Sequence, residues 1–512
     1  MTFTPCQEIL NHGHFTLGPG EILVRRSQIV ILSWLLLLAT DDRAAADPRP
    51  KETDAPASSL GIDPIEVARW PVEKIVLKNQ KRLEGLIQFE GPQHIEFVEI
   101  RRKPGEPMRR VFRWIPLERV EDIERLGEKE RTRLSLRLRE YMRRTEILER
   151  LLGDIELVPS EFEGRPCLKY DGRWYTLRSR ADEETTRLAI VRLEQVFAGF
   201  RTYLAPRRRH RETLQIVILG SAPEYQRLLK SRDLDIRQTA YYDPDNNEIV
   251  AGGQLASVAA ELDDVRAYHE VLVSELREKQ AEAEKQIETL GRTLRDAGED
   301  PRQVSSAMRA ARDQWKKIRQ SLDRRIRQAN WRNDALYHQA FRHLYHEAFH
   351  AYLGNFVIED AATTVPRWLN EGWAQIFEAG LLEAGTLRVD APSPERLERL
   401  QRELRGDSPL ELKHVVTAPV ERFIVGYRHR TSDQMEQDSR RVYLYSWGLA
   451  YHLTFHRKLL GSSALDNYLK ASEPGAPPDD IARFEKLVGE GLDQFEKNWR
   501  QAMLAERIPG SR

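Results

Sequence analysis

The chain has 512 residues, of which 40% are hydrophobic and 31% are charged, so it can bury cores in roughly two to four domains and is neither disordered nor collagen-like. Its 80 Lys and Arg residues balance its 80 Asp and Glu residues, which excludes bulk attraction to nucleic acid or anionic lipid. Cys6 and Cys167 are the two cysteines, so no intramolecular disulfide framework holds the mature chain together.

The first feature along the chain is typical of a secretion signal. Arg25 and Arg26 precede an apolar run over residues 29–39, and three alanines ending at Ala46 follow it. A basic region, a short apolar core and an Ala-x-Ala motif predict a signal peptide over residues 1–46, cleaved after Ala46. The apolar run is about a dozen residues long, whereas a bilayer span needs roughly 20. We therefore expect an exported protein, periplasmic or extracellular, which an uncleaved signal segment would tether to a membrane.

Two segments around this signal contribute no core. A secretion signal does not need the mixed polar stretch before Leu23, so we expect the true start of the chain near Leu23 or Val24. Residues 47–64 are rich in Pro, Ala, Asp and Ser over most of their length, which predicts a linker.

Residues 65–126 break into short runs of alternating apolar and polar residues, separated by Gly91-Pro92 and Pro104-Gly105. This pattern predicts antiparallel strands, and the size of the segment favours a small SH3-like β-barrel. We interpret this barrel as a spacer or docking module. Residues 127–153 then predict a charged, amphipathic connecting helix.

Residues 154–260 alternate between strand and helix patterns and predict the first half of an α+β domain. A hairpin over residues 167–179 precedes a helix over 182–204, and a buried strand over 213–220 follows. The basic run Arg207–Arg211 has no interleaved aromatic residues. We therefore interpret it as a solvated loop and expect no nucleic-acid partner.

Residues 261–330 predict an antiparallel coiled-coil hairpin inserted into this domain. Apolar residues recur at spacings typical of heptads on both sides of a turn near Pro301. They are Leu272, Leu276, Ala283, Ile287, Leu290 and Leu294 before the turn, and Met308, Ala311, Trp315, Ile318, Leu322 and Ile326 after it. We expect the hairpin to contact a protein partner or to gate a site.

The chemistry of the chain begins at His346-Glu347-Ala348-Phe349-His350, within a helix predicted from about Trp331 to Leu353. Residues i and i+4 lie on one helix face, so both imidazoles can bind one cation, while Glu347 lies beside it without binding. Zinc suits two imidazoles and a carboxylate with one open position, and a carboxylate near that position can act as a general base. The motif therefore requires a third ligand.

A second motif downstream offers this ligand. The sequence PRWLNEGWA over residues 366–374 opens another predicted helix, with proline in its first turn. HEAFH followed by NEG resembles the gluzincin metallopeptidases, in which two His and the Glu of the NE pair bind zinc and the Glu of HExxH is the base. The resemblance implies one zinc ion per chain, with His346, His350 and Glu371 as ligands and Glu347 as the general base.

The sequence of the second motif looks most like that of domain of unknown function 1570, a group of exported bacterial proteins regarded as zincins. The resemblance covers residues 336–380, and a weaker similarity extends over residues 445–453. It implies a zincin-like catalytic domain in which residues 331–391 form the zinc-binding helices and residues 392–512 form a helical C-terminal subdomain. The expected fold class is therefore α+β and multidomain.

Two departures from the resembling families limit what can be carried over. Thermolysin-like enzymes have an Asp four residues after the ligand Glu that orients the first His, whereas this chain has Gln375, which leaves the support of the ligands open. Aminopeptidases of the group have a G-x-M-E-N segment that captures the substrate amine, and this sequence has none. An endopeptidase is therefore favoured over an aminopeptidase.

Peptide hydrolysis also needs a donor for the oxyanion and a surface for the substrate. The helix YLYSWGLAYHLTFH offers several Tyr and His residues, and the resemblance favours Tyr445 as the donor, although packing against the catalytic helices would equally explain this residue. Zincin substrates usually bind along an exposed edge strand, and the resemblance suggests Glu248–Gly252 for this strand.

The sequence therefore predicts an exported zinc endopeptidase acting on a peptide or protein substrate. The alternative is an envelope scaffold or adaptor that keeps a metal site while the barrel and the coiled coil bind partners. An acid such as Glu347 beside the ligands argues against this alternative, because a relic site has no need for it.

Overall fold

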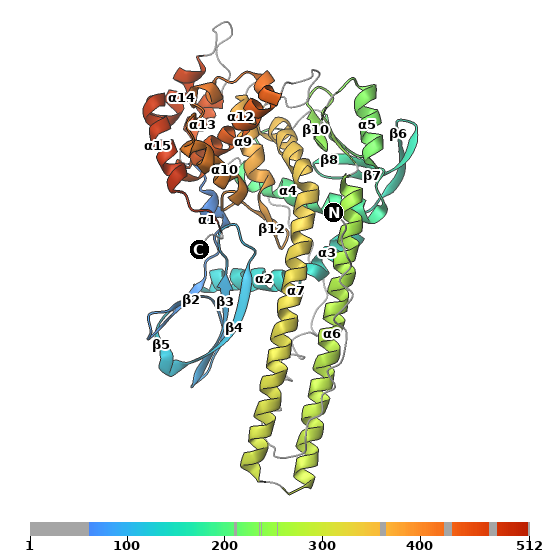
Figure 1. The fold of residues 1–512 in the computed structure, drawn as a ribbon, viewed down its shortest axis with the longest axis vertical. Helices are drawn as coiled ribbons and strands as arrows, with labels where there is room; N and C mark the ends of the chain where they lie inside the picture. The colour runs from blue at the N-terminus through green and yellow to red at the C-terminus, as the bar shows by residue number, and fades with distance from the viewer. Residues whose placement is uncertain are drawn as a thin grey trace. The chain divides into compact units, whose positions relative to one another are not determined.

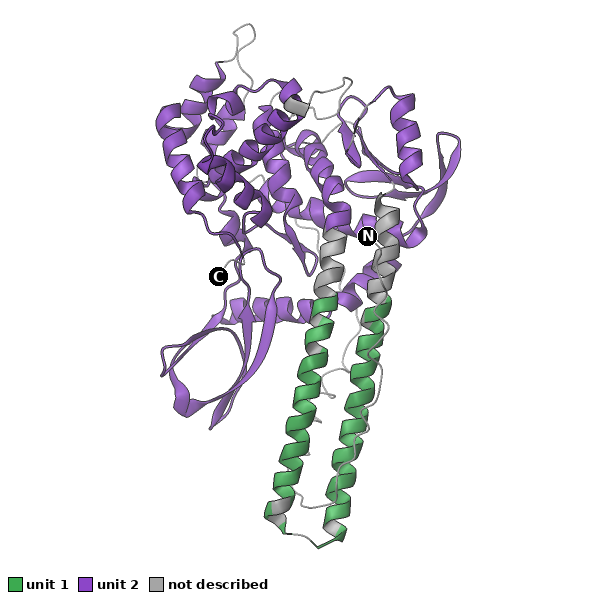
Figure 2. Ribbon diagram, viewed as in Figure 1, with its two compact units in different colours: residues 1–54, 261–336 green, residues 55–260, 337–512 purple. Residues whose placement is uncertain are grey.

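The computed structural model describes residues 61–208, 212–234, 236, 238–252, 254–298, 300–358, 365–423, 433–469 and 479–509. The predicted signal peptide, most of the predicted linker and part of the basic run Arg207–Arg211 lie outside these residues. The chain is a mixed α+β protein, as expected. It divides into two compact units, one containing residues 261–336 and the other containing residues 55–260 and 337–512 (Figure 2). None of the helices in the described ranges is long and apolar enough to cross a membrane.

The N-terminal module of the larger unit is a five-stranded antiparallel sheet (Figure 1). Helix α1 (Pro64–Ala68) precedes strands β1 (Glu73–Leu77), β2 (Arg82–Glu90), β3 (His94–Arg101), β4 (Arg109–Pro116) and β5 (Val120–Glu124). The strand order is β4-β3-β2-β1-β5, so β4 and β5 are the edges. Within residues 61–208 no ladder joins these two edges. In this range the short strand β5 pairs with β1 alone. The expectation of a closed barrel is therefore wrong, and the segment forms an open sheet.

Each face of this sheet buries its own apolar cluster. One face buries Ile75, Leu83, Ile87, Ile95, Phe97 and Ile115. The other face packs Leu86, Val98, Ile100 and Met108 against Leu134 and Leu138 of helix α2 (Glu128–Met142). The connecting helix expected over residues 127–153 is in fact two helices, since α2 ends at Met142 and, after Arg143, α3 (Arg144–Gly153) begins.

The next segment forms a six-stranded mixed sheet with the order β10-β11-β9-β8-β7-β6. Its strands are β6 (Val158–Phe162), β7 (Arg165–Asp171), β8 (Tyr175–Ser179), β9 (Leu214–Ile218), β10 (Ala240–Asp243) and β11 (Glu248–Ala251). Strands β8, β9 and β11 are parallel, and the apolar sequence of β9 suits a strand buried on both faces. Helices α4 (Glu183–Tyr203) and α5 (Ala222–Ser231) follow β8 and β9. Strand β11 lies inside the sheet, so the edge strand expected at Glu248–Gly252 is wrong, and β10 is the edge.

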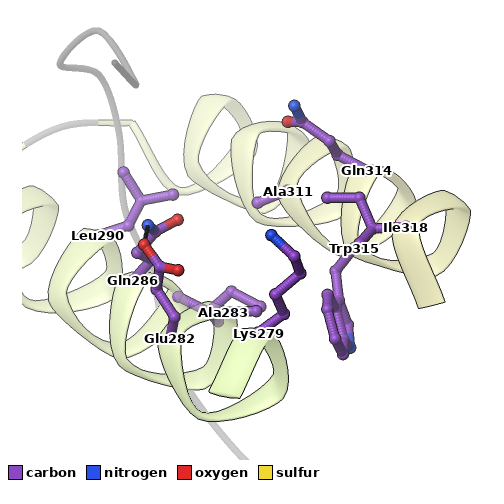
Figure 3. Close-up of a pocket in the computed structure, with 10 residues that line it drawn as sticks. Lys279, Glu282, Ala283, Gln286, Leu290, Ala311, Gln314, Trp315 and Ile318 are labelled. Carbon is purple, nitrogen blue, oxygen red and sulfur yellow. Dashed lines mark hydrogen bonds between the residues drawn. The ribbon is translucent and has the colours of Figure 1, made fainter. Parts of the chain in front are cut away.

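The smaller unit contains most of two long helices, α6 (Gln254–Asp296) and α7 (Pro301–Tyr352). They pack antiparallel, because Glu275 of α6 pairs with Arg325 of α7 at 3.3 Å while Leu294 and Val304 are buried together near the turn. Between these points the two helices enclose a small cavity of about 90 Å³ (Figure 3). The residues that line this cavity include Ala283, Gln286, Ile287, Leu290, Ala311, Gln314, Trp315 and Ile318.

Helices dominate the remainder of the larger unit. They are η3 (Leu353–Val357), α9 (Arg367–Glu378), α10 (Pro394–Arg405), α11 (Lys413–Val416), η4 (Val420–Arg422), α12 (Asp433–Tyr451), η5 (His452–His456), α13 (Ser463–Leu469), α14 (Asp480–Val488) and α15 (Leu492–Ala505), with the hairpin β12 (Leu381–Glu383) and β13 (Thr386–Arg388) after α9. Helices α9 and α12 cross at Gly372, where a Cβ atom would lie 2.5 Å from the Ser446 carbonyl oxygen. Glycine is therefore required by this close approach.

A buried ionic cluster fastens the N-terminal sheet to this helical region. Glu383 of β12 accepts hydrogen bonds from Arg102 at 2.6 Å and from the Met108 amide at 3.1 Å. Arg388 of β13 donates to Glu383 at 2.7 Å and to the Lys103 carbonyl at 3.0 Å, and its side chain is only 1% exposed. Buried charges are tolerated only when they are fully paired. Separating the sheet from the hairpin would remove partners of both Glu383 and Arg388, so these contacts fix the sheet in place.

Candidate metal centre

The end of α7 and the start of α9 bring the three predicted ligands together. His346 and His350 lie one helical turn apart, with their ring centroids 4.8 Å apart. The Nε2 atom of His346 is 3.2 Å from Oε2 of Glu371, and Nε2 of His350 is 3.6 Å from Oε1. Ligand atoms at the usual zinc distances of about 2.0–2.1 Å lie roughly 3.3 Å apart around a tetrahedral ion. The donor set and its spacing therefore fit a zinc ion.

Both imidazoles are oriented by partners on their other nitrogen. Nδ1 of His346 lies 2.7 Å from Oε2 of Glu378, and Nδ1 of His350 lies 2.8 Å from Oδ1 of Asn370. A carboxylate or an amide oxygen at Nδ1 accepts its proton and leaves the lone pair on Nε2 free for a metal. Both nitrogens that point toward Glu371 are thus prepared as ligands.

Glu378 supplies the support that Gln375 cannot give. It lies seven residues after Glu371, two turns along the same face of α9, and is buried. Arg342 contacts it at 3.0 Å, and Arg396 donates to the same oxygen. Burial opposes the charge, but Arg396, His346 and Arg342 hold the pKa of this carboxyl well below its usual range. Gln375 instead donates to the carbonyls of Glu371 and Tyr443, so it ties α9 to α12.

The charges around the centre favour a bound cation. Burial would lower the pKa of His346, but its hydrogen bonds to Glu371 and Glu378 raise it to about 10. Burial also opposes the charge of Glu371, while Arg367 and His350 hold the pKa of this carboxyl well below its usual range. Two ionised carboxylates that face one imidazole require positive charge, which a proton or a divalent metal ion can provide.

Glu347 occupies the position expected of a general base. Its Oε2 accepts a hydrogen bond of 2.9 Å from the backbone amide of Tyr242, in the edge strand β10. Burial raises the pKa of this carboxyl above its ordinary value. The acid is therefore held between the ligand helix and the sheet edge, beside the ligands and not among them.

The expected oxyanion donor, Tyr445, is not brought to this centre. Its hydroxyl accepts from the Leu410 amide at 3.1 Å, and its ring packs against Trp499. Tyr443, two residues earlier on α12, lies on the opposite side of the helix, because two residues correspond to about 200° of rotation. Burial and the nearby charge of Glu371 raise the pKa of Tyr443, and its hydroxyl donates a hydrogen bond to the Phe423 carbonyl. The structure therefore places Tyr443, and not Tyr445, beside Glu371 and Arg367.

Arg367 is another residue at the centre that we did not predict from the sequence. It lies one turn before Glu371 on α9, and its Nη2 is 2.7 Å from Oε1 of Glu371. Asn370 and Glu378 could have been proposed from their places beside and two turns after the ligand. Arg367 could have been proposed likewise from its place one turn before the ligand, whereas Tyr443 had no such signal, since it lies on α12, far along the sequence.

Comparison with known families is consistent with this geometry. Residues 341–472 match the model of a family described as "Protein of unknown function (DUF1570)". This segment contains both halves of the metal centre and Tyr443, and it confirms the family resemblance expected from the motifs. No curated protein matches the chain at a significant level.

Proposed function

We propose that this chain, whose residues 341–472 fall within that family, is an exported zinc-dependent metallopeptidase with a zincin-like catalytic domain. One observation carries the proposal. Two imidazoles, each oriented at Nδ1, converge on Glu371, while a further acid, Glu347, lies beside them. A purely structural zinc site is closed by four protein ligands and has no use for a separate acid.

Each residue of the centre has a distinct role in the proposed hydrolysis. A zinc ion held by His346, His350 and Glu371 would supply Lewis acidity and lower the pKa of a nearby water molecule. Glu347 takes a proton from the attacking water and returns it to the nitrogen of the leaving amine. Burial raises the pKa of this carboxyl, which favours the protonated form that the second step requires.

Tyr443 and Arg367 are suited to the charge that develops on the substrate carbonyl oxygen. A guanidinium and a phenol beside the ligands can stabilise this charge by hydrogen bonds, once the Tyr443 hydroxyl turns from the Phe423 carbonyl, to which it donates in this structure. The Arg367 side chain is 30% exposed, and Tyr443 is partly buried. A substrate oxygen can therefore approach both groups.

The sheet edge provides the surface for an extended substrate. Strand β10 pairs with β11 on one side only, and the amide of Tyr242 within it contacts Glu347. A peptide added beside β10 would form main-chain hydrogen bonds along the strand next to the general base. Binding in this manner uses the middle of a peptide and requires no free terminus, which favours an endopeptidase.

Metal analysis and an activity assay test the proposal together. Purified protein should contain one zinc per chain, and His350→Ala should lose it, while His414→Ala, which changes an exposed His, should retain it. Quenched fluorescent peptides blocked at both ends should be cleaved, and Glu347→Gln should keep the metal but lose at least 100-fold in rate. A wild-type protein that holds zinc but cleaves none of a broad library of blocked peptides and unfolded proteins would contradict the peptidase assignment and favour a scaffold.

A further inference from the structure

Strand β4 of the N-terminal sheet is an uncovered edge of unusual character. It has eight residues, Arg109–Pro116, whereas edge strands in soluble proteins are commonly kept short. β3 pairs with β4 along its whole length. No other strand among the described residues pairs with its second side. The backbone groups on that side can therefore receive a further strand.

Aromatic side chains lie on one face of this edge. Phe112 and Trp114 of β4 are 58% and 65% exposed, and the ring of His94 lies 4.3 Å from that of Trp114. Phe112 and Trp114 alternate along the strand with Ile115, which is buried in the cluster on the opposite face. They project from the face that carries α2, and α2 leaves them exposed. Large aromatic side chains that remain exposed in this way are typical of binding sites.

The opposite face of the same edge is basic. Arg109, Val111, Arg113 and Ile115 alternate with the aromatic residues, and β4 contains no acidic residue. Arg109 is 68% exposed, with Glu106 at 3.7 Å, and Arg113 pairs with Glu99. A strand added to β4 would therefore have its side chains alternately beside a face with Arg110, Phe112 and Trp114 and beside a face with Arg109 and Arg113, because successive side chains of a strand point to opposite faces.

We propose that β4 binds an extended segment of a partner polypeptide in which apolar residues alternate with acidic ones. The backbone of this segment pairs with β4, its apolar side chains pack on Phe112 and Trp114, and its acidic side chains face Arg109 and Arg113. This mode takes affinity from main-chain hydrogen bonds and specificity from alternate side chains. It does not depend on the proposed peptidase activity.

Two other occupants fit the surface less well. Exposed aromatics near arginines also occur in sites for single-stranded nucleic acid, but here Glu96 lies directly between Trp114 and Phe89 across the sheet and would repel a phosphate backbone. A second copy of the chain would bring six arginines of two β4 strands together without an acidic residue between them, which is unfavourable.

Fluorescence anisotropy with a defined probe tests the proposal. The probe is a labelled peptide of four Glu-Val repeats, and the protein is the full chain in the Glu347→Gln background, so that the probe is not cleaved. Trp114→Ala and Phe112→Ala should each weaken binding at least 10-fold. Phe89→Ala changes an equally exposed aromatic residue on the same face but two strands from the edge, and it should change affinity less than twofold.

Charge and backbone are tested separately. A Lys-Val peptide should bind at least 10-fold more weakly than the Glu-Val peptide, and Arg109→Glu should reduce this preference. Hydrogen exchange should show that the Glu-Val peptide slows exchange of amides in β4 and leaves those in β5 unchanged. Circular dichroism and melting curves establish that each variant is folded, which the exposure of these side chains leads us to expect.

Several outcomes would overturn the proposal. They are absence of binding at millimolar peptide, equal losses in Phe89→Ala and Trp114→Ala, or protection that does not include β4. Stronger binding of an oligo-dT probe that is lost in Trp114→Ala would assign the surface to nucleic acid. A dimer in sedimentation that Trp114→Ala dissociates would assign it to a second copy.

Discussion

Nδ1 of His346 on α7 and a carboxylate oxygen of Glu378 on α9 lie 2.7 Å apart, and this contact determines which nitrogen of the imidazole faces the metal position. Glu378 is itself held by Arg342 and Arg396. The arrangement extends the centre well beyond its three ligands. Partners of this kind are usually important for metal affinity as well as for geometry.

Replacing this carboxylate should weaken zinc binding while leaving the three ligands in place. We expect Glu378→Gln to raise the zinc dissociation constant about 10- to 100-fold, measured by competition with a chromogenic chelator. Glu395→Gln, an exposed change on α10, is the matched control and should have no effect. Unchanged affinity in a folded Glu378→Gln protein would mean that the carboxylate does not support the ligand.

Tyr443 and Tyr445 provide a matched pair on one helix. Tyr443→Phe should lower kcat by about 100- to 1000-fold with zinc content unchanged, since one donor to the oxyanion is lost. Tyr445→Phe removes a hydrogen bond to the Leu410 amide and should cost only about 1 kcal/mol of stability, with nearly unchanged kcat. The reverse ranking of the two rates would restore Tyr445 as the donor.

Gly372 should tolerate no side chain. An added Cβ would lie 2.5 Å from both the Ser446 carbonyl oxygen and the Ala450 Cβ, so Gly372→Ala must separate α9 from α12. We expect a loss of about 1–3 kcal/mol in the free energy of unfolding and weaker zinc binding. Gly153→Ala introduces a Cβ with no atom within 4 Å and serves as the control in denaturant titrations.

Metal removal should lower the melting temperature. A ligand that binds the folded state alone stabilises it by about 4 kcal/mol at a concentration of 1,000 times its dissociation constant. Calorimetry with and without a chelator should therefore show a clear shift for the wild type. His350→Ala should melt at a temperature that no longer depends on zinc, and a zinc-dependent shift in this variant would indicate that the ion binds elsewhere.

Acid should destabilise the fold through His452. Burial lowers the pKa of this imidazole to about 3, and its Nδ1 has no hydrogen-bond partner. The unfolded chain takes up this proton below about pH 6.5 and the folded chain only near pH 3, so stability falls as pH decreases through this window, by up to about 1.4 kcal/mol per unit. In urea titrations, His452→Phe should show a smaller loss between pH 6.5 and 4 than the wild type. An identical pH dependence in both proteins would argue against this role.

Much of the metal centre could be predicted from the sequence, because its ligands follow from local rules. His346 and His350 share a helix face by their spacing, and the NEG motif placed Glu371 on a second helix. The position of Tyr443 beside the centre could not be predicted, because it depends on the rotation of α12 against α9. The sequence alone does not show which of the two tyrosines, Tyr443 or Tyr445, faces α9.

The strands, like the metal centre, could be predicted only in part from the sequence. Their alternation and the turn residues between them indicated the N-terminal sheet correctly. Whether β4 and β5 join is decided by long-range pairing, on which alternation carries no information. For the same reason the resemblance suggested Glu248–Gly252 as the exposed edge strand, since nothing local in this segment reveals that β10 pairs with its outer side.

The buried cluster of Glu383 and Arg388 has a consequence for how long a substrate must be. Because this cluster locks the N-terminal sheet to the helices that carry the metal centre, the distance between β4 and Glu347 is fixed. A polypeptide held at β4 would therefore raise the effective concentration of its own remaining segments at the centre, but only when the intervening chain is long enough to reach. Cleavage efficiency would then increase sharply above a minimum chain length, and weakening the cluster would make this increase more gradual.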